Sequence, residues 1–353
     1  VRTGLLLPAV LSASQSPTIQ LFGEPIEHTQ RTISSLSGPV YLDIYQPKTT
    51  PPLLPRARSG LLIFPGSGDN RQEPQLINLL EALAHSGLVV MNMTTTTMIN
   101  YDLSAQDADA AVQSFKTLLS LPAMAGNRAG ILSLSAGVPF ACFAAADPRI
   151  RDQVAYVTVF GGYFNTVDVL RAFGHRSITA DGHTEAWRPD PVPLEVLGNV
   201  ITKPLTLDEQ TVIKNAINGG TPLLASDVAL LSPPARAAYH LLAGDDPEHV
   251  EANIAALPSS VQAELTALSP SQIVDRIHAP MFLLHDRHDP SIPFTESRAF
   301  AAALSRLHHP YDYVEFNIFD HVEVRSDLNI GQLVGDGSHL FSMLDQMMLL
   351  GSQ

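Results

Sequence analysis

The chain has little cysteine, little positive charge and no long apolar run, and each shortage excludes something. Its 353 residues include one cysteine, Cys142, so no disulfide can form within the chain. Lys and Arg total 21 against 35 Asp and Glu, which gives a formal net charge of −14. An acidic chain without a local Lys or Arg cluster repels phosphate backbones and anionic lipid surfaces. We therefore expect no nucleic-acid partner, and we interpret Cys142, in an apolar run, as a buried packing residue.

The N-terminal residues are apolar but too few to cross a membrane. Residues 4–11 form the run, and a membrane span needs about 20 such residues. No other stretch is a candidate span. Because the run follows Arg2 and precedes small residues, it resembles the tail of a signal peptide, and a short helix or strand packed on the body is the other interpretation. We expect a cytoplasmic protein, with export as the alternative that this run leaves open.

What the chain does have is ample core material, with 45% hydrophobic and only 16% charged residues. Short β-rich runs alternate with helical patterns, as in a parallel sheet with crossover helices. Residues 40–45 alternate and indicate an edge strand, whereas the continuous apolar runs belong at the sheet centre. We predict strands over 40–45, 61–64, 88–93, 129–132, 154–160, 281–284 and 313–318. We predict helices over 76–84, 104–119 with Ser104 as its cap, 138–146, 207–217, 247–256, 294–307 and 340–350.

Residues 163–271 break this alternation. They contain Pro and Gly punctuation and several helical patterns, but no convincing series of strands. Both flanks return at once to sheet-like strands, so we predict a mainly helical cap over the carboxyl edge of the sheet, where ligands bind in open α/β sheets. A separate domain is the alternative. The chain then divides into an N-terminal segment (1–38), a first part of the α/β core (39–162), the cap (163–271) and a second part of the core (272–353).

The most informative stretch runs from the strand at residues 129–132 into Ser133-Leu134-Ser135-Ala136-Gly137 and a helix of small residues. A nucleophile on a tight strand-to-helix turn needs small residues two positions before and after it, and these are Ser133 and Gly137. The N–H groups at the start of that helix favour developing negative charge. An ordinary turn with a capping serine is the alternative. The pattern resembles the Gly-x-Ser-x-Gly motif of the α/β-hydrolase superfamily, with Ser133 in place of the first glycine.

Two later segments resemble the same superfamily, in its chain order of serine, acid and histidine. Residues 279–293 look like its acid segment, an apolar strand that ends in His-Gly-x-x-Asp-x-x-Val-Pro. His285 and Asp289 match this pattern, while Asp286 replaces the glycine. The resemblance places the base at His321, after the last strand, with Asp289 orienting its imidazole. Asp320 and Asp168 are the alternative acids.

The resemblance also implies an oxyanion hole made of two backbone N–H groups. One belongs to Ala136, and the other to Ser67 in Pro65-Gly66-Ser67-Gly68, which resembles the superfamily's His-Gly-x-x loop with Pro65 in place of His. A plain Gly-rich turn is the alternative. As a phosphate loop the segment lacks the required Gly-Lys-Ser/Thr ending.

The fold implied by the resemblance is the α/β-hydrolase fold, a mostly parallel central sheet flanked by helices, with a mainly helical cap insertion. We predict a carboxylesterase-like serine hydrolase in which Ser135 attacks a small-molecule ester or acyl substrate and His321 moves the proton, without a cofactor. The alternatives are a thioesterase, peptidase, acyltransferase or C–C hydrolase on the same triad, or a non-catalytic binding protein with this fold. The His and Asp residues of 285–289 resemble a metal cluster, but the sequence offers no partner cluster and we predict no metal site.

Overall fold

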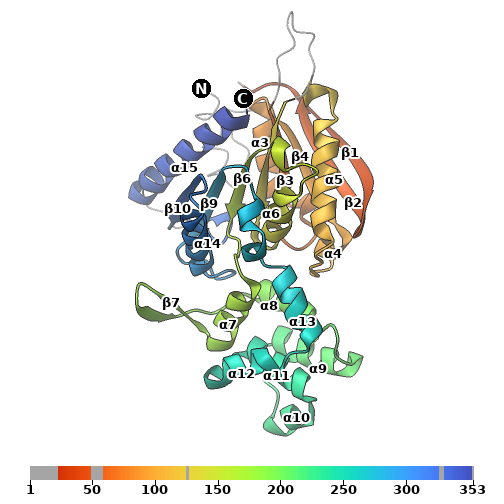
Figure 1. The fold of residues 1–353 in the computed structure, drawn as a ribbon, viewed down its shortest axis with the longest axis vertical. Helices are drawn as coiled ribbons and strands as arrows, with labels where there is room; N and C mark the ends of the chain where they lie inside the picture. Colours follow the sequence, from red (N-terminus) through yellow and green to blue (C-terminus); the bar gives the residue numbers. More distant parts are fainter. Residues whose placement is uncertain (1–22, 49–58, 125–126, 326–329, 352–353) are drawn as a thin grey trace, which may run out of the picture.

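The computed structural model describes residues 23–48, 59–124, 127–325 and 330–351, so the apolar run at residues 4–11 lies outside the described residues. An eight-stranded sheet in the order β1-β2-β4-β3-β5-β6-β9-β10 forms the centre of the molecule (Figure 1). Its strands are β1 (Ile26–Ser35), β2 (Gly38–Pro47), β3 (Gly60–Phe64), β4 (Val89–Thr95), β5 (Ala129–Leu134), β6 (Val154–Phe160), β9 (Met281–Asp286) and β10 (Tyr311–Phe316). From β4 to β10 all neighbours pair in parallel, while β2 pairs antiparallel with both β1 and β4.

All seven predicted strands are present, but the predicted edge is wrong. The strand at residues 40–45 is β2, and β1 covers its outer side over ten paired positions. Most side chains of β1 are exposed, so its sequence carries no apolar alternation that could have revealed it. This strand lies inside the stretch predicted as an N-terminal segment, and the sheet therefore begins before residue 39.

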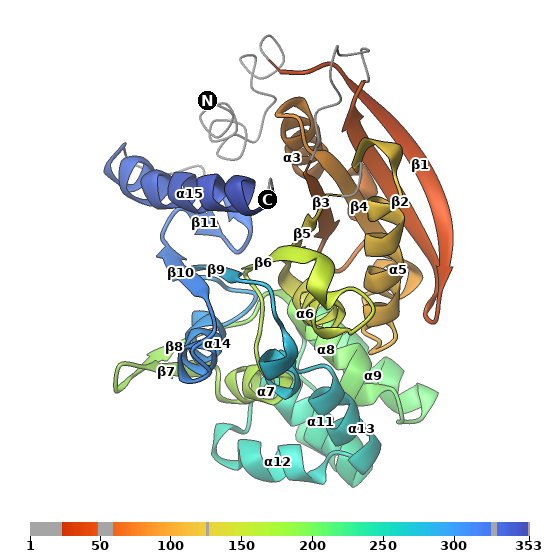
Figure 2. The ribbon, with the colours of Figure 1, turned by 45° about the horizontal axis from the view of Figure 1, so that its top comes forward.

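Helices cover both faces of the sheet, which places one apolar core on each side (Figure 2). On one face lie α3 (Pro74–His85) and α15 (Ile330–Gly351), and on the other lie α5 (Asp107–Leu119), α6 (Val138–Ala146) and α14 (Phe294–Arg306). The helix predicted over 340–350 thus begins a full ten residues earlier. No helix in the described part of the chain is both long enough and apolar enough to cross a membrane.

The predicted N-cap of α5 is also wrong. Gln106 occupies the N-cap position, and the Ser104 hydroxyl instead accepts a hydrogen bond from the Gln106 N–H at 3.3 Å. The Asp107 N–H donates to the Ser104 carbonyl, so a separate turn precedes the helix. The Ser104 side chain therefore closes that turn rather than the first turn of α5.

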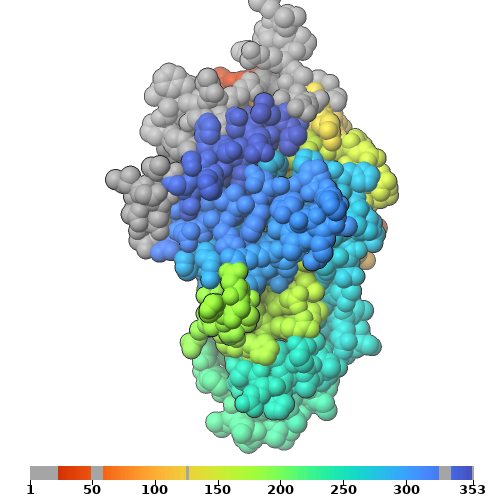
Figure 3. All heavy atoms as spheres, turned by 60° about the vertical axis from the view of Figure 1, so that its left-hand side comes forward, coloured from red at the N-terminus to blue at the C-terminus, as the bar shows by residue number. Residues whose placement is uncertain are grey.

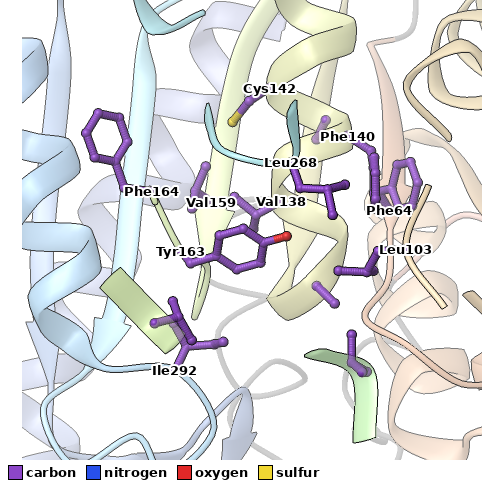
Figure 4. Packing of buried hydrophobic residues seen from close by; sticks show 14 of the residues in the cluster. Phe64, Leu103, Val138, Phe140, Cys142, Val159, Tyr163, Phe164, Leu268 and Ile292 are labelled. Carbon is purple, nitrogen blue, oxygen red and sulfur yellow. The ribbon is translucent and has the colours of Figure 1, made fainter. Parts of the chain in front are cut away.

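Cys142 is a packing residue, as predicted. It lies on α6 in the same core as Phe64 and Phe140, whose rings stack with centroids 5.7 Å apart (Figure 4). Its side chain is fully buried, and burial raises the pKa of the thiol far above its ordinary value. A thiol in this environment is not a nucleophile at neutral pH.

The chain between β6 and β9 forms a lobe at one end of the sheet (Figures 1 and 3). Its helices are α7 (Thr166–His175), α8 (Pro191–Thr202), α9 (Leu207–Asn218), α10 (Ala225–Leu230), α11 (Pro233–Ala243), α12 (Val250–Ala256) and α13 (Ser259–Ala267). The lobe also contains a two-stranded hairpin that was not predicted, β7 (Ser177–Ala180) with β8 (His183–Ala186). Its turn residues Asp181 and Gly182 both have positive φ, and the Asp-Gly pair is a sequence signal for such a turn.

Candidate active site

The turn from β5 into α6 holds Ser135 in a strained conformation. Ser135 has φ +49°, a left-handed value that few residues other than glycine adopt, and it opens the short 3-10 turn Ser135–Gly137. The turn leads directly into α6. Such strain persists only where the surrounding structure enforces it, and it is concentrated at functional sites.

Close packing explains why the residues around Ser135 are small. A Cβ on Gly137 would lie 2.4 Å from the Pro65 carbonyl oxygen, and one on Gly66 would lie 3.2 Å from Ser135 Cβ. Ser133 is fully buried, and its hydroxyl donates to the Thr158 carbonyl at 3.1 Å. The β5–α6 turn therefore packs directly against the loop after β3.

The loop after β3 is held from inside by a side chain that the sequence analysis missed. Asn70 Nδ2 donates to the carbonyl oxygens of Gly66 and Ser67 at 3.0 and 3.3 Å. The Gly68 N–H donates to the Met98 carbonyl at 2.8 Å. The two bonds from Asn70 direct carbonyls of the loop toward this side chain, and the bond from Gly68 joins the loop to Met98. No short motif identifies Asn70, because its role depends on the loop's folded shape.

Two of the predicted catalytic residues are hydrogen-bonded to each other. His321 Nδ1 lies 2.7 Å from Asp289 Oδ2. The other carboxylate oxygen of Asp289 accepts the backbone N–H groups of Ser291 and Ile292, at 2.7 and 2.9 Å. The backbone of the loop between β9 and α14 therefore holds the carboxylate in place independently of its contact with the imidazole.

A second imidazole contacts the same carboxylate. His285 is fully buried, with Nε2 3.2 Å from Asp289 Oδ2 and Nδ1 2.7 Å from the Ser297 hydroxyl. Burial disfavours the charge on Asp289, but the two histidines outweigh it and hold the pKa of this carboxyl well below its usual range. Asp289 is therefore ionised at neutral pH, as a residue that stabilises an imidazolium must be.

His321 lies in a tight turn between two very short strands, β11 (Phe319–Asp320) and β12 (Glu323–Val324). Its φ is +57°, and a Cβ on Gly161, at the end of β6, would lie 3.0 Å from the imidazole. Within the described part of the chain, Nε2 is buried and has no hydrogen-bond partner. Because Nδ1 is bonded to Asp289, Nε2 is the ring atom that remains for proton transfer.

Asp286, which stands where the superfamily has glycine, connects the acid loop to the histidine loop. One of its oxygens accepts the His288 N–H and the other accepts the Phe319 N–H, both at 2.8 Å. Burial raises the pKa of this carboxyl. The departure from the superfamily pattern thus helps to fix the segment that carries His321.

The alternative acids do not reach the imidazole. Asp168 lies on α7 and is paired with Arg171. Asp320 is exposed, and among the described residues it is Asp289 that hydrogen-bonds to the ring of His321. The described residues contain no group of three or more His, Cys, Asp or Glu side chains arranged to hold a metal ion.

The five predicted site residues line one cavity of about 420 Å³ or stand directly behind it. Ser67, Ser135, Ala136 and His321 are lining residues, and Asp289 is buried behind His321. Residues of the lobe, including Asp190 and Val196 of α8 and its N-cap, line the same cavity. The carboxyl ends of β3 and β5, the histidine turn and the lobe therefore meet at one place.

The chain has the α/β-hydrolase fold, with a mostly parallel central sheet flanked by helices. No protein-family model and no curated protein sequence matches it. Solved structures do match: the acylaminoacyl peptidase of Pyrococcus horikoshii has a TM-score of 0.51 and 12% identity over 92% of this chain. A puromycin-hydrolyzing peptidase of Mycobacterium tuberculosis has a TM-score of 0.50 and 17% identity over 91% of this chain. A 2,6-dihydroxy-pseudo-oxynicotine hydrolase has a TM-score of 0.52 and 13% identity over 92% of this chain.

At such low identity these likenesses establish the fold alone. The chain spans 41% of the acylaminoacyl peptidase and 39% of the puromycin-hydrolyzing peptidase, but 69% of the 2,6-dihydroxy-pseudo-oxynicotine hydrolase. The α/β-hydrolase fold, which the resemblance around Ser135 and Asp289 implies, is confirmed.

Proposed function

We propose that this protein is a serine hydrolase that uses Ser135, His321 and Asp289. The observation that carries the proposal is the arrangement around His321: its Nδ1 is bonded to an ionised, buried Asp289, and its buried Nε2 shares a cavity with Ser135. A serine hydroxyl needs such an oriented base, because it is a weak nucleophile at its ordinary pKa.

The reaction follows from these positions. His321 Nε2 accepts the hydroxyl proton as Ser135 Oγ attacks the substrate carbonyl carbon, and Asp289 stabilises the imidazolium that forms. The backbone N–H groups of Ala136 and Ser67 hold the oxygen that becomes negative. The imidazolium then gives its proton to the leaving group, and the acyl-enzyme remains. Water attacks the acyl-enzyme with His321 again as base, which releases the acid and restores Ser135.

We propose an amide, in a peptide or an acylated amine, as the scissile bond rather than the simple carboxylic ester predicted from the sequence. Two of the structures described above are peptidases, which supports this choice. The cavity bears on the charge of the substrate: its charged lining residues Glu73, Asp190 and Glu323 are acidic, and no Lys or Arg is found among its described lining residues. A negatively charged cavity lining favours neutral or amine-bearing substrates over substrates that carry a carboxylate.

The lobe between β6 and β9 acts in this proposal as the cap predicted for residues 163–271. Residues of α8 and its N-cap Asp190 line the cavity that contains Ser135. The Trp187 indole N–H, from the same lobe, donates to the Asp289 carbonyl oxygen at 2.9 Å. This hydrogen bond joins the cap to the loop that carries the proposed catalytic acid.

The proposal is tested with one ester and one amide that carry comparable acyl groups. We expect the protein to release p-nitroaniline from N-acetyl-alanine p-nitroanilide and p-nitrophenol from p-nitrophenyl acetate, and a fluorophosphonate to label Ser135. Ser135→Ala should abolish turnover and labelling, whereas Ser305→Ala, on the exposed side of α14, should leave both unchanged. Turnover that survives in Ser135→Ala would show that Ser135 is not the nucleophile. Failure of the fluorophosphonate to label the wild type would favour a binding protein.

A further inference from the structure

The described residues cover the central strand of the sheet incompletely on one face. β5 lies between β3 and β6, yet Leu132 and Leu134 are only partly buried, whereas Ile131 and Ser133 are fully buried. Successive side chains of a strand point to opposite faces. Among the described residues, no helix therefore covers the centre of the face that carries Leu132 and Leu134, where an apolar floor would normally be covered by one.

The opening lies between the two helices of that face. α3 packs on β2 and β4, and α15 packs on β5, β6 and β10, so they cover opposite sides of the sheet centre. Leu79 of α3 and Leu344 and Met348 of α15 are partly buried and line the space between them. We call this space the α3–α15 groove. Apolar side chains of β3, β5, β6, α3 and α15 line it, among them Leu61, Leu132, Phe160, Leu76 and Met347.

The groove and the proposed catalytic site belong to one cavity. The lining of that cavity runs from Leu132 and Leu134 in the groove to Ser135 and His321 without a break into separate pockets. Ser135 directly follows Leu134 in the chain, so an occupant of the groove lies beside the nucleophile. None of the acidic lining residues Glu73, Asp190 and Glu323 lies on β3, β5 or β6, the strands that form the floor.

The floor of the groove offers few polar partners. Tyr156 and Thr158 of β6 both line it and carry hydroxyls, and the Thr158 hydroxyl is paired with the Met347 sulfur at 3.5 Å. A polar group placed there would lose most of its hydrogen bonds to water without replacement, whereas a hydrocarbon has none to lose. Methionine and leucine side chains also adapt to the shape of a flexible chain.

We propose that the α3–α15 groove binds a long, unbranched apolar chain of the substrate, while the carbonyl to be attacked sits at Ser135. The inference rests on the proposed hydrolase function and specifies its substrate as a chain-bearing amide. Either side of the scissile bond can supply the chain, as a fatty acyl group or as an alkyl amine. Both have the same chemistry in the groove, so the experiment separates them.

Binding to Ser135→Ala tests the groove without requiring turnover. Titration calorimetry would compare N-methyl alkanamides with acyl chains of 4–12 carbons, which place the chain on the acyl side, with N-alkyl acetamides of the same lengths, which place it on the amine side. We expect one series to bind about two- to fourfold tighter for each added CH₂, because each buried methylene contributes roughly 0.8 kcal/mol. The series that responds identifies the side. Affinity that is independent of chain length in both series overturns the proposal.

Substitutions in the groove locate the chain. Met348→Trp, from α15, and Leu79→Trp, from α3, narrow the groove from opposite walls and should each weaken a ten-carbon ligand at least tenfold but a four-carbon ligand little. Phe341→Trp is the matched control, since Phe341 lies on α15 with an exposed side chain and does not line the cavity. Equal loss for short and long ligands, or no loss in both groove variants, overturns the location. Fluorophosphonate labelling of the parent protein reports separately on the proposed catalysis, so its failure would not be confused with failure of the groove.

Discussion

His321 Nδ1 and Asp289 Oδ2 lie 2.7 Å apart, although 31 residues separate them in the chain. The contact fixes which ring nitrogen carries the proton and leaves Nε2 for Ser135. An amide in place of the carboxylate favours the wrong tautomer and no longer stabilises the imidazolium. We therefore expect Asp289→Asn to lower kcat roughly 10³- to 10⁴-fold, measured with a chromogenic amide or ester.

The adjacent acid provides the control for this experiment. Asp320 precedes His321 in the chain but is exposed, and its substitution by Asn removes one negative charge from the turn that carries His321. Asp320→Asn should keep kcat within a few fold of the wild type. If Asp320→Asn lost as much activity as Asp289→Asn, the hydrogen bond to Asp289 would not be what activates His321.

The sequence predicted most of the sheet and the residues of the site because both depend on local patterns. Most side chains of β3 to β6 and β9 are buried, and most of them are apolar, which is typical of central parallel strands. The motif around Ser135 was recognisable because close packing requires a residue without a side chain at Gly137. The motif around Asp289 combines several residues whose spacing is fixed by one loop.

Elements defined by backbone pairing or by contacts between separate segments could not be predicted in this way. β1 has exposed side chains and exists because its backbone pairs with β2, which no periodicity reports. Asn70 donates a hydrogen bond back to the Gly66 carbonyl of its own loop, and Asp286 accepts one from the N–H of Phe319, which is distant in the chain. Only the folded structure reveals these two roles. The α3–α15 groove depends on the distance between two helices that are more than 200 residues apart in the chain.

Gly137 should tolerate no side chain, because its position is set by backbone atoms that cannot move independently. A Cβ there would lie 2.4 Å from the Pro65 carbonyl oxygen and 2.8 Å from that of Phe64. We expect Gly137→Ala to lower the free energy of unfolding by about 3 kcal/mol or more in urea denaturation.

Gly198 is the matched control for this substitution. It lies inside α8, and its nearest neighbour would be Leu242 Cδ1 at 3.5 Å, an ordinary contact. Gly198→Ala should be neutral or stabilising by up to about 1 kcal/mol, since alanine is the better helix former. Equal stability of the two variants would contradict the close packing of the β5–α6 turn on the β3 loop.

His285 should matter for stability as well as for activity. It is fully buried, and its ring bonds the Ser297 hydroxyl and the Ile292 carbonyl besides approaching Asp289. His285→Phe leaves these groups without partners, and we expect a loss of about 2–4 kcal/mol in the free energy of unfolding. His288→Phe, at a largely exposed ring in the same loop, should change stability by less than about 0.5 kcal/mol. A similar small effect in His285→Phe would show that the acid loop does not depend on this histidine.

Glu296 should make the protein less stable as the pH rises toward neutrality. Its carboxyl is fully buried and accepts the N–H groups of Phe164 and Asn165, and burial raises its pKa from 4.5 to about 7. Between about pH 4.5 and 7 the folded protein holds this proton and the unfolded chain does not. The free energy of unfolding therefore falls as pH rises through this window, by up to about 3 kcal/mol from this group. Glu296→Gln keeps an oxygen for both N–H groups but cannot ionise. In urea denaturation, its free energy of unfolding should therefore lack the part of the pH dependence that Glu296 contributes. Glu248→Gln, at an exposed position, should keep the pH dependence of the wild type. Parallel stability curves for the wild type and Glu296→Gln between pH 4.5 and 8 would contradict an elevated pKa at this position.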